Sequence, residues 1–409
     1  MKDILLKQIT LPDESIADVL IHDGIFKTIA KQIDTQKDTI VIDGRDKAIL
    51  PAFYNTHNHA AMTLLRGYAD DMELHKWLTE YIWPYEAKMT DEDIYLGTKL
   101  AILEMIKSGT VFFNDMYWKH GAVLKAVQET GIRACIGCLV LGDNPQLIED
   151  GCDFIKAHKN DSPLIQFSID PHAVYTTSLD FYQKTAQFAE EQGIYLHTHL
   201  SETVSEVENC YKEHGVSPVR YLADAGVLSK RTIAAHCVHC SDDDIALMRQ
   251  HDVVVAHNPV SNMKLNSGYA PIEKFLKQGV RVTLGTDGCS SNNNLDMREE
   301  MKFASLLGKL HGAAESLPVE TVMKMACQTG AEAFGINGGV IAEGKVADCL
   351  LIKLDNVAMQ PCYHLLSNWV YAAQSEVIDT VICNGDILMQ DRKVAFEDEL
   401  IATIRERYV

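Results

Sequence analysis

The stretch PAFYNTHNHAAM, residues 51–62, carries an apolar run into two histidines, His57 and His59, that are separated by one residue. The apolar lead-in starts at Ala48, and its composition is typical of a buried strand. Residues two apart on a strand point to the same face. The stretch therefore predicts a buried strand that ends by presenting two imidazoles side by side.

Seven further apolar runs follow, separated by stretches such as residues 178–193 and 240–251, whose apolar residues have helical spacing. Eight strand–helix units in series predict an α/β fold, a (β/α)8 TIM-type barrel. A doubly wound sheet is the competing interpretation, but no glycine-rich phosphate loop follows the first run. The seven runs are TVFFNDM (110–116), IRACIGCLVL (132–141), LIQFSID (164–170), IYLHTHL (194–200), RTIAAHC (231–237), DVVVAHN (252–258) and VRVTLGTD (280–287).

Both ends of the chain have a different pattern, with short strands and tight turns. Residues 16–30 alternate in polarity and turn at Asp23–Gly24, and residues 378–395 turn at Asn384–Gly385. Such dipeptides between apolar runs are typical of β-hairpins. We expect a small β-sandwich domain formed by both termini, with the barrel between them. The expected boundaries are 1–50 and 345–409 for the sandwich and 51–344 for the barrel.

Composition narrows the class of protein. Of the 409 residues, 47% are apolar and 23% charged, and the formal net charge is -20. The negative charge argues against nucleic acid as a partner. No apolar run reaches the about 18 residues of a membrane span, and the N-terminus does not read as a signal peptide. We expect a cytoplasmic protein that acts on a small molecule, with no membrane partner; a homo-oligomer is compatible with the sequence.

Eleven cysteines are scattered through apolar segments, as expected for a reducing compartment. Two pairs, Cys135/Cys138 and Cys237/Cys240, have Cys-x-x-Cys spacing, which is also found in zinc ribbons. However, the first pair lies in an apparent buried strand, where residues three apart face opposite sides. Free buried thiols are the favoured interpretation.

Polar residues recur where the eight runs end. In TIM barrels, catalytic groups sit at the carboxyl ends of the strands. A random scatter of the chain's 16 histidines would not favour these positions so consistently. The residues concerned are His57, His59, Asn114, Asp115, His172, His199, His236, His257 and Asp287.

Four of these residues suggest a metal site. His57 and His59 share one face, His199 comes from the opposite side of a closed barrel, and Asp287 follows the last run. Three imidazoles and a carboxylate, with a position open for water, are typical of a catalytic Zn²⁺ site. Fe²⁺ fits the same ligands. By spacing alone, His197 is an alternative to His199.

The chain resembles the amidohydrolase superfamily, and within it the branch of methylthioadenosine/S-adenosylhomocysteine deaminases and related chlorohydrolases. The resemblance implies a barrel with a composite sandwich domain and a hydrolytic, zinc-dependent aminohydrolase. It further implies an adenine nucleoside of the adenosine, methylthioadenosine or S-adenosylhomocysteine type as substrate, with release of ammonia. The motifs that carry it are NTHNHAAMTLLRGYADDMELHKWL (55–78), HTHLSET (197–203), AAHCVH (234–239), VAHNPVSNMKLNSG (255–268) and LGTDGCSSNNNLDM (284–297).

The resemblance also implies site residues. Its metal ligands match His57, His59, His199 and Asp287, with His197 in support. Many superfamily members hold two metals bridged by a carboxylated lysine after the fourth strand. Residues 162–178 contain no lysine, so we expect one divalent ion.

Proton transfer is expected to depend on Glu202, three residues after His199. A carboxylate beside the metal accepts a proton from water and passes it to a ring nitrogen, and the resemblance assigns this role, with substrate contact, to Glu202. A helix cap is the alternative. His236 is expected to orient the attacking oxygen, and Asp287 to relay the second proton.

Residues 63–90 are the expected pocket wall, because they form a long insertion between the first two strands. Trp83 supplies a flat surface for a base or ribose, with core packing as the alternative. By resemblance, Glu86 binds the ribose hydroxyls and His172 contacts the substrate. The deaminases often carry an arginine where this chain has Cys138, which leaves the 5′ substituent of the nucleoside open.

Other functions share parts of this pattern. A guanine- or pterin-like deaminase or an s-triazine chlorohydrolase would use the same metal site. Hydrolysis of a cyclic imide usually goes with the bridging lysine that is missing here. A non-catalytic metal-binding scaffold would have no use for Glu202, His236 and Asp287 as proton-transfer groups.

Overall fold

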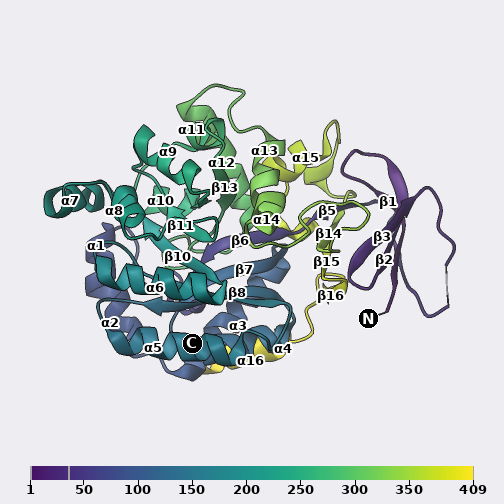
Figure 1. The fold of residues 1–409 in the computed structure, drawn as a ribbon. Helices are drawn as coiled ribbons and strands as arrows, with labels where there is room; N and C mark the ends of the chain where they lie inside the picture. The colour runs from purple at the N-terminus through teal and green to yellow at the C-terminus, as the bar shows by residue number, and fades with distance from the viewer. Residues whose placement is uncertain (1, 36, 409) are drawn as a thin grey trace.

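The computed structural model describes residues 2–35 and 37–408, and at its centre eight parallel strands form a barrel (Figure 1). Consecutive strands pair in parallel along the whole series, with register shifts only between β6 and β7. Each of the eight predicted runs is a strand, so the predicted TIM-type barrel is confirmed. The strands are β6 (Phe53–Asn58), β7 (Thr110–Tyr117), β8 (Arg133–Val140), β9 (Ile165–Pro171), β10 (Tyr195–Leu200), β11 (Thr232–His236), β12 (Val254–His257) and β13 (Arg281–Leu284).

The ring closes where β13 meets β6. The amide of Asp287 donates a hydrogen bond to the carbonyl of His57 (3.0 Å). One layer below, the hydroxyl of Thr56 lies 2.7 Å from that of Thr283 and donates to the carbonyl of Leu284 (2.9 Å). Closure brings the first and last strands of the barrel side by side, and with them two of the expected metal ligands.

Helices cover the outside of the barrel, and the two that the spacing singled out are α6 and α9. Capping boxes begin α3 at Thr90 and α9 at Ser241, which satisfies backbone N–H groups of the first turns. Within the described ranges, no helix is long and apolar enough to cross a membrane. The helices are α1 (Leu74–Trp77), α2 (Trp83–Glu86), α3 (Asp91–Lys107), α4 (His120–Thr130), α5 (Pro145–His158), α6 (Leu179–Gln192), α7 (Val204–His214), α8 (Pro218–Asp224), α9 (Asp242–Gln250), α10 (Pro259–Lys264), α11 (Ile272–Lys277), α12 (Met297–His311), α13 (Val319–Lys324), α14 (Gly330–Ala333), α15 (Leu365–Ser367) and α16 (Glu397–Tyr408).

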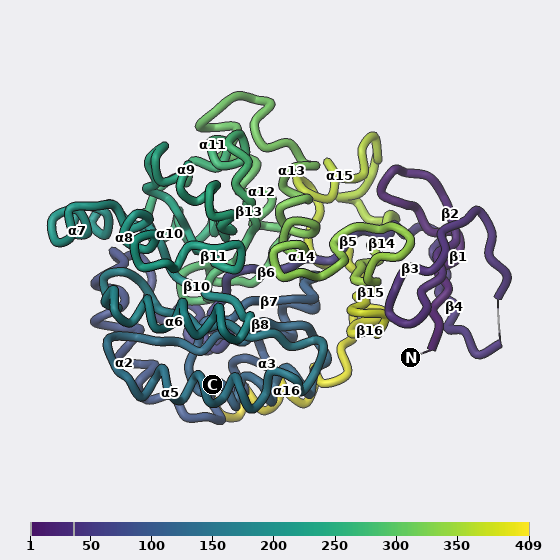
Figure 2. Tube along the Cα trace, viewed as in Figure 1, coloured from purple at the N-terminus to yellow at the C-terminus, as the bar shows by residue number. Residues whose placement is uncertain are grey.

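A separate sheet is built from both ends of the chain, as expected (Figure 2). Its order is β16-β15-β14-β5-β1-β2-β3, with β4 paired to β1, and apolar side chains from both halves form one core. Its strands are β1 (Ile4–Thr10), β2 (Ile16–His22), β3 (Ile25–Ala30), β4 (Ile40–Asp43), β5 (Lys47–Pro51), β14 (Cys349–Lys353), β15 (Ile378–Cys383) and β16 (Asp386–Met389).

The two predicted hairpin turns meet inside this sheet. Gly24 and Gly385 both have a left-handed backbone, with φ of 74° and 82°. A Cβ on Gly385 would lie 2.7 Å from the Cα of Gly24, so the turns approach too closely for a side chain. This contact joins the N-terminal hairpin to the C-terminal one.

The last helix leaves the sheet and lies along the barrel. α16 packs against α3, where the amine of Lys107 bonds to Glu397 (2.6 Å) and the guanidinium of Arg407 to Asp93 (2.8 Å) (Figure 1). The division into 1–50 with 345–409 and 51–344 stays our proposal for the domain boundaries.

A buried polar cluster connects the sheet to the barrel. Asp348 accepts hydrogen bonds from the hydroxyl of Tyr54 in β6 (2.5 Å) and from Nε of Arg133 in β8 (3.2 Å). Its other oxygen accepts from the amide of Asn384 (2.5 Å). Asp348 and Tyr54 are fully buried and Arg133 is 6% exposed. If a substitution removes one member of this cluster, water is therefore a poor replacement for the lost hydrogen bonds.

Asp348→Ala should lower the free energy of unfolding by about 3–5 kcal/mol, because it leaves the Arg133 guanidinium buried without its carboxylate. Chemical unfolding followed by circular dichroism measures this loss. Asp386→Ala removes an exposed carboxylate from β16 of the same terminal sheet and serves as the control. Equal midpoints for the two variants would contradict the proposed link.

Candidate metal centre

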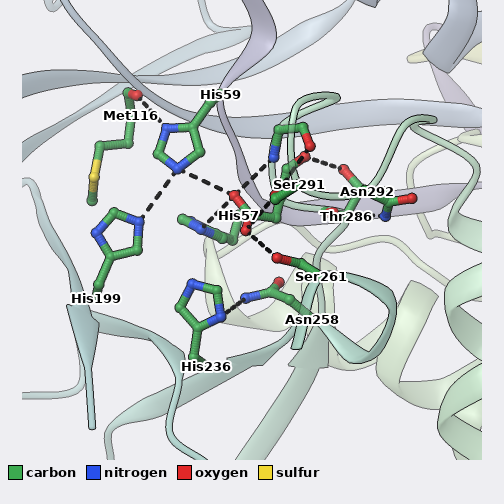
Figure 3. Close-up of polar contacts among 12 residues, drawn as sticks. His57, His59, Met116, His199, His236, Asn258, Ser261, Thr286, Ser291 and Asn292 are labelled. Carbon is green, nitrogen blue, oxygen red and sulfur yellow. Dashed lines mark hydrogen bonds and ion pairs between the residues drawn. The ribbon is translucent and has the colours of Figure 1, made fainter. Parts of the chain in front are cut away.

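Side chains from the carboxyl ends of four strands converge at one end of the barrel (Figure 3). His57 lies near the end of β6 and His59 follows it. His199 comes from β10, His236 ends β11, and Asp287 follows β13. The structure therefore brings together the residues that the sequence singled out from distant parts of the chain.

The Nε2 atoms of His59 and His199 point toward one another. Nδ1 of His59 donates to the carbonyl of Met116 (2.7 Å), and Nδ1 of His199 donates to the carbonyl of His172 (2.9 Å). In a neutral imidazole the other nitrogen is then an acceptor. The two Nε2 atoms lie 3.3 Å apart (Figure 3).

The carboxylate of Asp287 completes the group. Its Oδ1 lies 3.4 Å from Nε2 of His57 and 3.3 Å from Nε2 of His59. Its Oδ2 accepts hydrogen bonds from the hydroxyls of Ser261 (2.6 Å) and Ser291 (2.9 Å). The two hydroxyl donors favour the ionised form of this group, a carboxylate.

These four residues fit a divalent metal ion. Neighbouring ligands bound tetrahedrally at 2.0–2.2 Å lie about 3.3–3.6 Å apart. Three of the six pairs, His59–His199, His57–Asp287 and His59–Asp287, lie at 3.3–3.4 Å. The ligand atoms of His57, His59 and Asp287 all lie within 4.8 Å of one another. Burial lowers the pKa of His57 and His199 well below the ordinary value and keeps both neutral, the form that binds metal. Among the described residues, Nε2 of His57 has no hydrogen-bond partner. A divalent cation at this point would contact the ring nitrogens and the carboxylate together.

His197 lies behind this centre. Its Nε2 is 2.9 Å from Nδ1 of His57, and Nδ2 of Asn114 lies 3.0 Å from its Nδ1. His197 is two residues before His199 on the same face of β10, and thus one layer deeper in the barrel. From this position His197 supports His57 but does not reach the centre itself.

His236 stands beside the group. Its Nδ1 lies 2.8 Å from Oδ1 of Asn262 and 3.3 Å from Nδ2 of Asn258 (Figure 3). A proton on Nδ1 satisfies the Asn262 oxygen and leaves Nε2 free to face the cavity. With His57 and His199, His236 forms a second set of nitrogens that lie within 4.8 Å of one another.

Glu202 faces His236 across the mouth of the centre. Its Oε2 lies 3.8 Å from Nε2 of His236, and its Oε1 accepts from the hydroxyl of Ser267 (3.0 Å). Burial raises the pKa of Glu202, which suits a group that must hold a proton. Thr203, rather than Glu202, caps α7.

The loop that carries Glu202 depends on a second buried carboxyl group. Glu206 accepts hydrogen bonds from the amides of Ser201 and Glu202, both at 2.8 Å. Nothing in the sequence distinguished Glu206 or Ser267 from ordinary loop and helix residues.

Trp83, Glu86 and His172 line the same cavity as the centre, so the structure brings every expected site residue to one place or its margin. The insertion at residues 63–90 forms α1, a π-turn and α2 and supplies much of the wall, as expected. None of the described residues lining the cavity is a lysine or an arginine. The other lining residues are His59, Met62, Leu74, Trp77, Leu78, Met116, Tyr117, Trp118, Leu139, Leu141, Tyr175, His199, Glu202, His236, Leu265 and Asp287.

Two contacts shape the cavity wall. The hydroxyl of Tyr117 donates to Oε1 of Glu86 (2.6 Å), and burial raises the pKa of Glu86 to about 7. The rings of Trp83 and His172 meet edge to face at 6.3 Å. Tyr117 was missed in the sequence, where it reads as the apolar end of a strand.

Cys138 is not part of the cavity wall. A Cβ on Gly151 of α5 would lie 3.0 Å from the Cβ of Cys138, so this side chain points to the helical layer. Strand alternation places Leu139 at the cavity instead. An arginine at position 138 would therefore lie on the outer face of β8.

Known proteins resemble this chain over nearly its whole length. A profile described as the amidohydrolase family matches residues 48–388. The chain is 45% identical to a 5′-deoxyadenosine deaminase of Methanospirillum hungatei, over 99% of this chain and 93% of that one. It is 48% identical to 5-methylthioadenosine/S-adenosylhomocysteine deaminase 1 of Archaeoglobus fulgidus, over 90% and 89%.

A solved structure of an adenosine deaminase from Xanthomonas campestris, with bound zinc, is also similar. Its TM-score is 0.93 at 29% identity, covering 99% of this chain and 97% of that one. On the family profile and the two relatives above 40% identity, the chain is a hydrolytic enzyme and belongs to the amidohydrolase family.

Proposed function

We propose that the chain is a hydrolytic deaminase that uses one divalent metal ion, most simply Zn²⁺, to release ammonia from an adenine nucleoside. The observation that carries the proposal is the set of imidazole nitrogens and carboxylate oxygen 3.3–3.4 Å apart, beside Glu202 and His236. The names of the relatives, which act on 5′-deoxyadenosine, methylthioadenosine or S-adenosylhomocysteine, support the substrate class.

The proposed ligands are His57, His59, His199 and Asp287. A divalent ion held by them supplies Lewis acidity and lowers the pKa of water to about 7. The end of β9 carries Asp170, Pro171 and His172 and no lysine that would bridge a second ion. One ion per chain is therefore the simplest occupancy.

Proton transfer follows from the positions of three side chains. Glu202 accepts a proton from the attacking water and delivers it to a ring nitrogen of the purine. His236 orients the attacking oxygen through Nε2, which faces the Glu202 carboxylate at 3.8 Å. Asp287 passes the second proton of the water to the exocyclic nitrogen. A C–O bond forms, the C–N bond breaks, and ammonia leaves.

The remaining cavity residues suit a nucleoside. Trp83 and His172 offer ring surfaces, and Glu86 offers an acceptor for sugar hydroxyls. A guanine- or pterin-like deaminase and an s-triazine chlorohydrolase would use the same centre. Assays for ammonia and chloride release on a panel of these compounds distinguish the three.

One tightly held divalent ion per chain should depend on the His57 and His59 imidazoles. Elemental analysis of purified His57→Ala/His59→Ala should show loss of the ion, whereas His120→Ala, a histidine of α4 outside the centre, should keep it. Two ions per chain, or full occupancy in the double variant, would show the mononuclear assignment to be wrong.

Glu202→Gln should keep the metal and lower turnover by at least about 10²-fold, because an amide keeps the shape but cannot take the proton. Steady-state ammonia release and elemental analysis test the two parts. Glu208→Gln, an exposed glutamate of α7, is the matched control. Near-normal turnover by Glu202→Gln would exclude its role as proton shuttle.

A small uncharged 5′ substituent should be preferred, since the described cavity wall offers no cation to an amino-acid carboxylate. We expect kcat/KM for 5′-deoxyadenosine and methylthioadenosine to exceed that for S-adenosylhomocysteine by at least about 10-fold, or about 1.4 kcal/mol. Leu141→Arg, which adds a cation to the half-buried wall, should narrow the difference. Equal values for the three substrates in the wild type would count against this selection.

A further inference from the structure

The carboxyl group of Glu86 and the hydroxyl of Tyr117 form a buried pair in the cavity wall. The distance from the Tyr117 oxygen to Oε1 of Glu86 is 2.6 Å, and the two residues are 2% and 5% exposed. The pair joins α2, in the insertion, to the carboxyl end of β7. The proposed chemistry at the metal centre makes no use of Tyr117.

The two oxygens of Glu86 have different surroundings. Oε1 accepts from Tyr117, whose only other polar contact among the described residues is a weak one to Sδ of Met89 (3.8 Å). Oε2 has no hydrogen-bond partner in the described part of the chain, yet it is not among the fully enclosed unpaired atoms. Since Glu86 lines the cavity, Oε2 is the oxygen that a ligand can reach.

We propose that Tyr117 is a positioning residue that holds Oε1 of Glu86, so that Oε2 accepts a hydrogen bond from a sugar hydroxyl of the substrate. This inference rests on the proposed nucleoside deaminase function. A carboxylate fixed in this way loses little rotamer freedom when the sugar binds. Loss of the Tyr117 hydroxyl would therefore weaken binding of the sugar and leave the chemical step at the purine ring unchanged.

Electrostatics support this geometry. Burial raises the pKa of Glu86 to about 7, against the opposing effect of the Tyr117 hydroxyl. The other titratable groups acting on the pair are Asp115 and Tyr85, through Tyr117. As pH falls through 7, Glu86 takes a proton and Oε2 becomes a poorer acceptor, so KM for nucleosides should rise. Without the hydroxyl, the carboxylate is less favoured and the rise should begin at higher pH.

The first experiment compares adenosine with 2′,3′-dideoxyadenosine on wild type and Tyr117→Phe. We expect Tyr117→Phe to raise KM for adenosine about 10-fold, as for loss of one charged hydrogen bond, with kcat within about two-fold. KM for the dideoxy compound should not change. In wild type, KM should rise below pH 7 for adenosine only, and in Tyr117→Phe this rise should shift to higher pH.

Tyr95→Phe is the matched control, because its hydroxyl also donates to a glutamate, Glu129, at 2.6 Å but on the outer helical layer. It should leave KM and its pH dependence unchanged for both compounds. Glu86→Ala with Tyr117→Phe should be no worse than Glu86→Ala alone, since both remove one contact. If Tyr117→Phe does not fold, the test is the pH dependence of the wild-type KM for the two compounds.

The outcomes separate the inference from the function on which it rests. A wild-type enzyme that releases ammonia from no nucleoside overturns both. Nucleoside turnover with additive losses in the double variant overturns the positioning role alone. The same follows if Tyr117→Phe impairs kcat equally for adenosine and the dideoxy compound, or if the wild-type KM values have the same pH dependence.

Discussion

The candidate centre depends on ring nitrogens and a carboxylate oxygen that are held close together. Nε2 of His59 lies 3.3 Å both from Nε2 of His199 and from Oδ1 of Asp287. Each is held from behind, by the carbonyls of Met116 and His172 for the imidazoles. Such an arrangement is unfavourable without a cation and well suited to one, because the ligands need not move to bind it.

Barrel closure makes that arrangement rigid. The backbone hydrogen bond from Asp287 to His57 joins the last strand to the first at the level of the ligands. The same closure lets Glu202 and His236, from neighbouring strands, face each other at 3.8 Å. Hydrolysis needs a nucleophile, a proton carrier and an orienting group together, and three strand ends supply them on a frame that does not move.

Burial gives the same cavity two chemical regions. At the centre, neutral imidazoles and one carboxylate stay ready for a metal because desolvation keeps the histidines unprotonated. In the wall, the insertion brings Glu86 to Tyr117 among leucines and tryptophans. The insertion therefore forms much of the wall of the cavity, while the strand ends carry the residues of the centre.

The repeating pattern of the chain was enough for the barrel and for most of the centre. The eight apolar runs and the one-residue spacing of His57 and His59 are local patterns. Such patterns can be read from a sequence because side chains repeat with different periods in strands and in helices. The expected histidines and Asp287 followed from their places at strand ends. Spacing did not separate His197 from His199, because both project from the same face of β10 and only depth along the barrel axis distinguishes them.

The tertiary structure alone decided the contacts that pair distant residues. Tyr117 meets Glu86 across 31 positions and Ser267 meets Glu202 across 65, and neither pair leaves a periodic signal. The structure likewise decided that Leu139, and not Cys138, lines the cavity, since the face that a residue presents depends on the register of its strand within the closed ring. The sequence by itself determined the barrel and the types of side chain at the centre. Only the tertiary structure determined the direction in which those side chains point, because that direction depends on contacts between segments far apart in the chain.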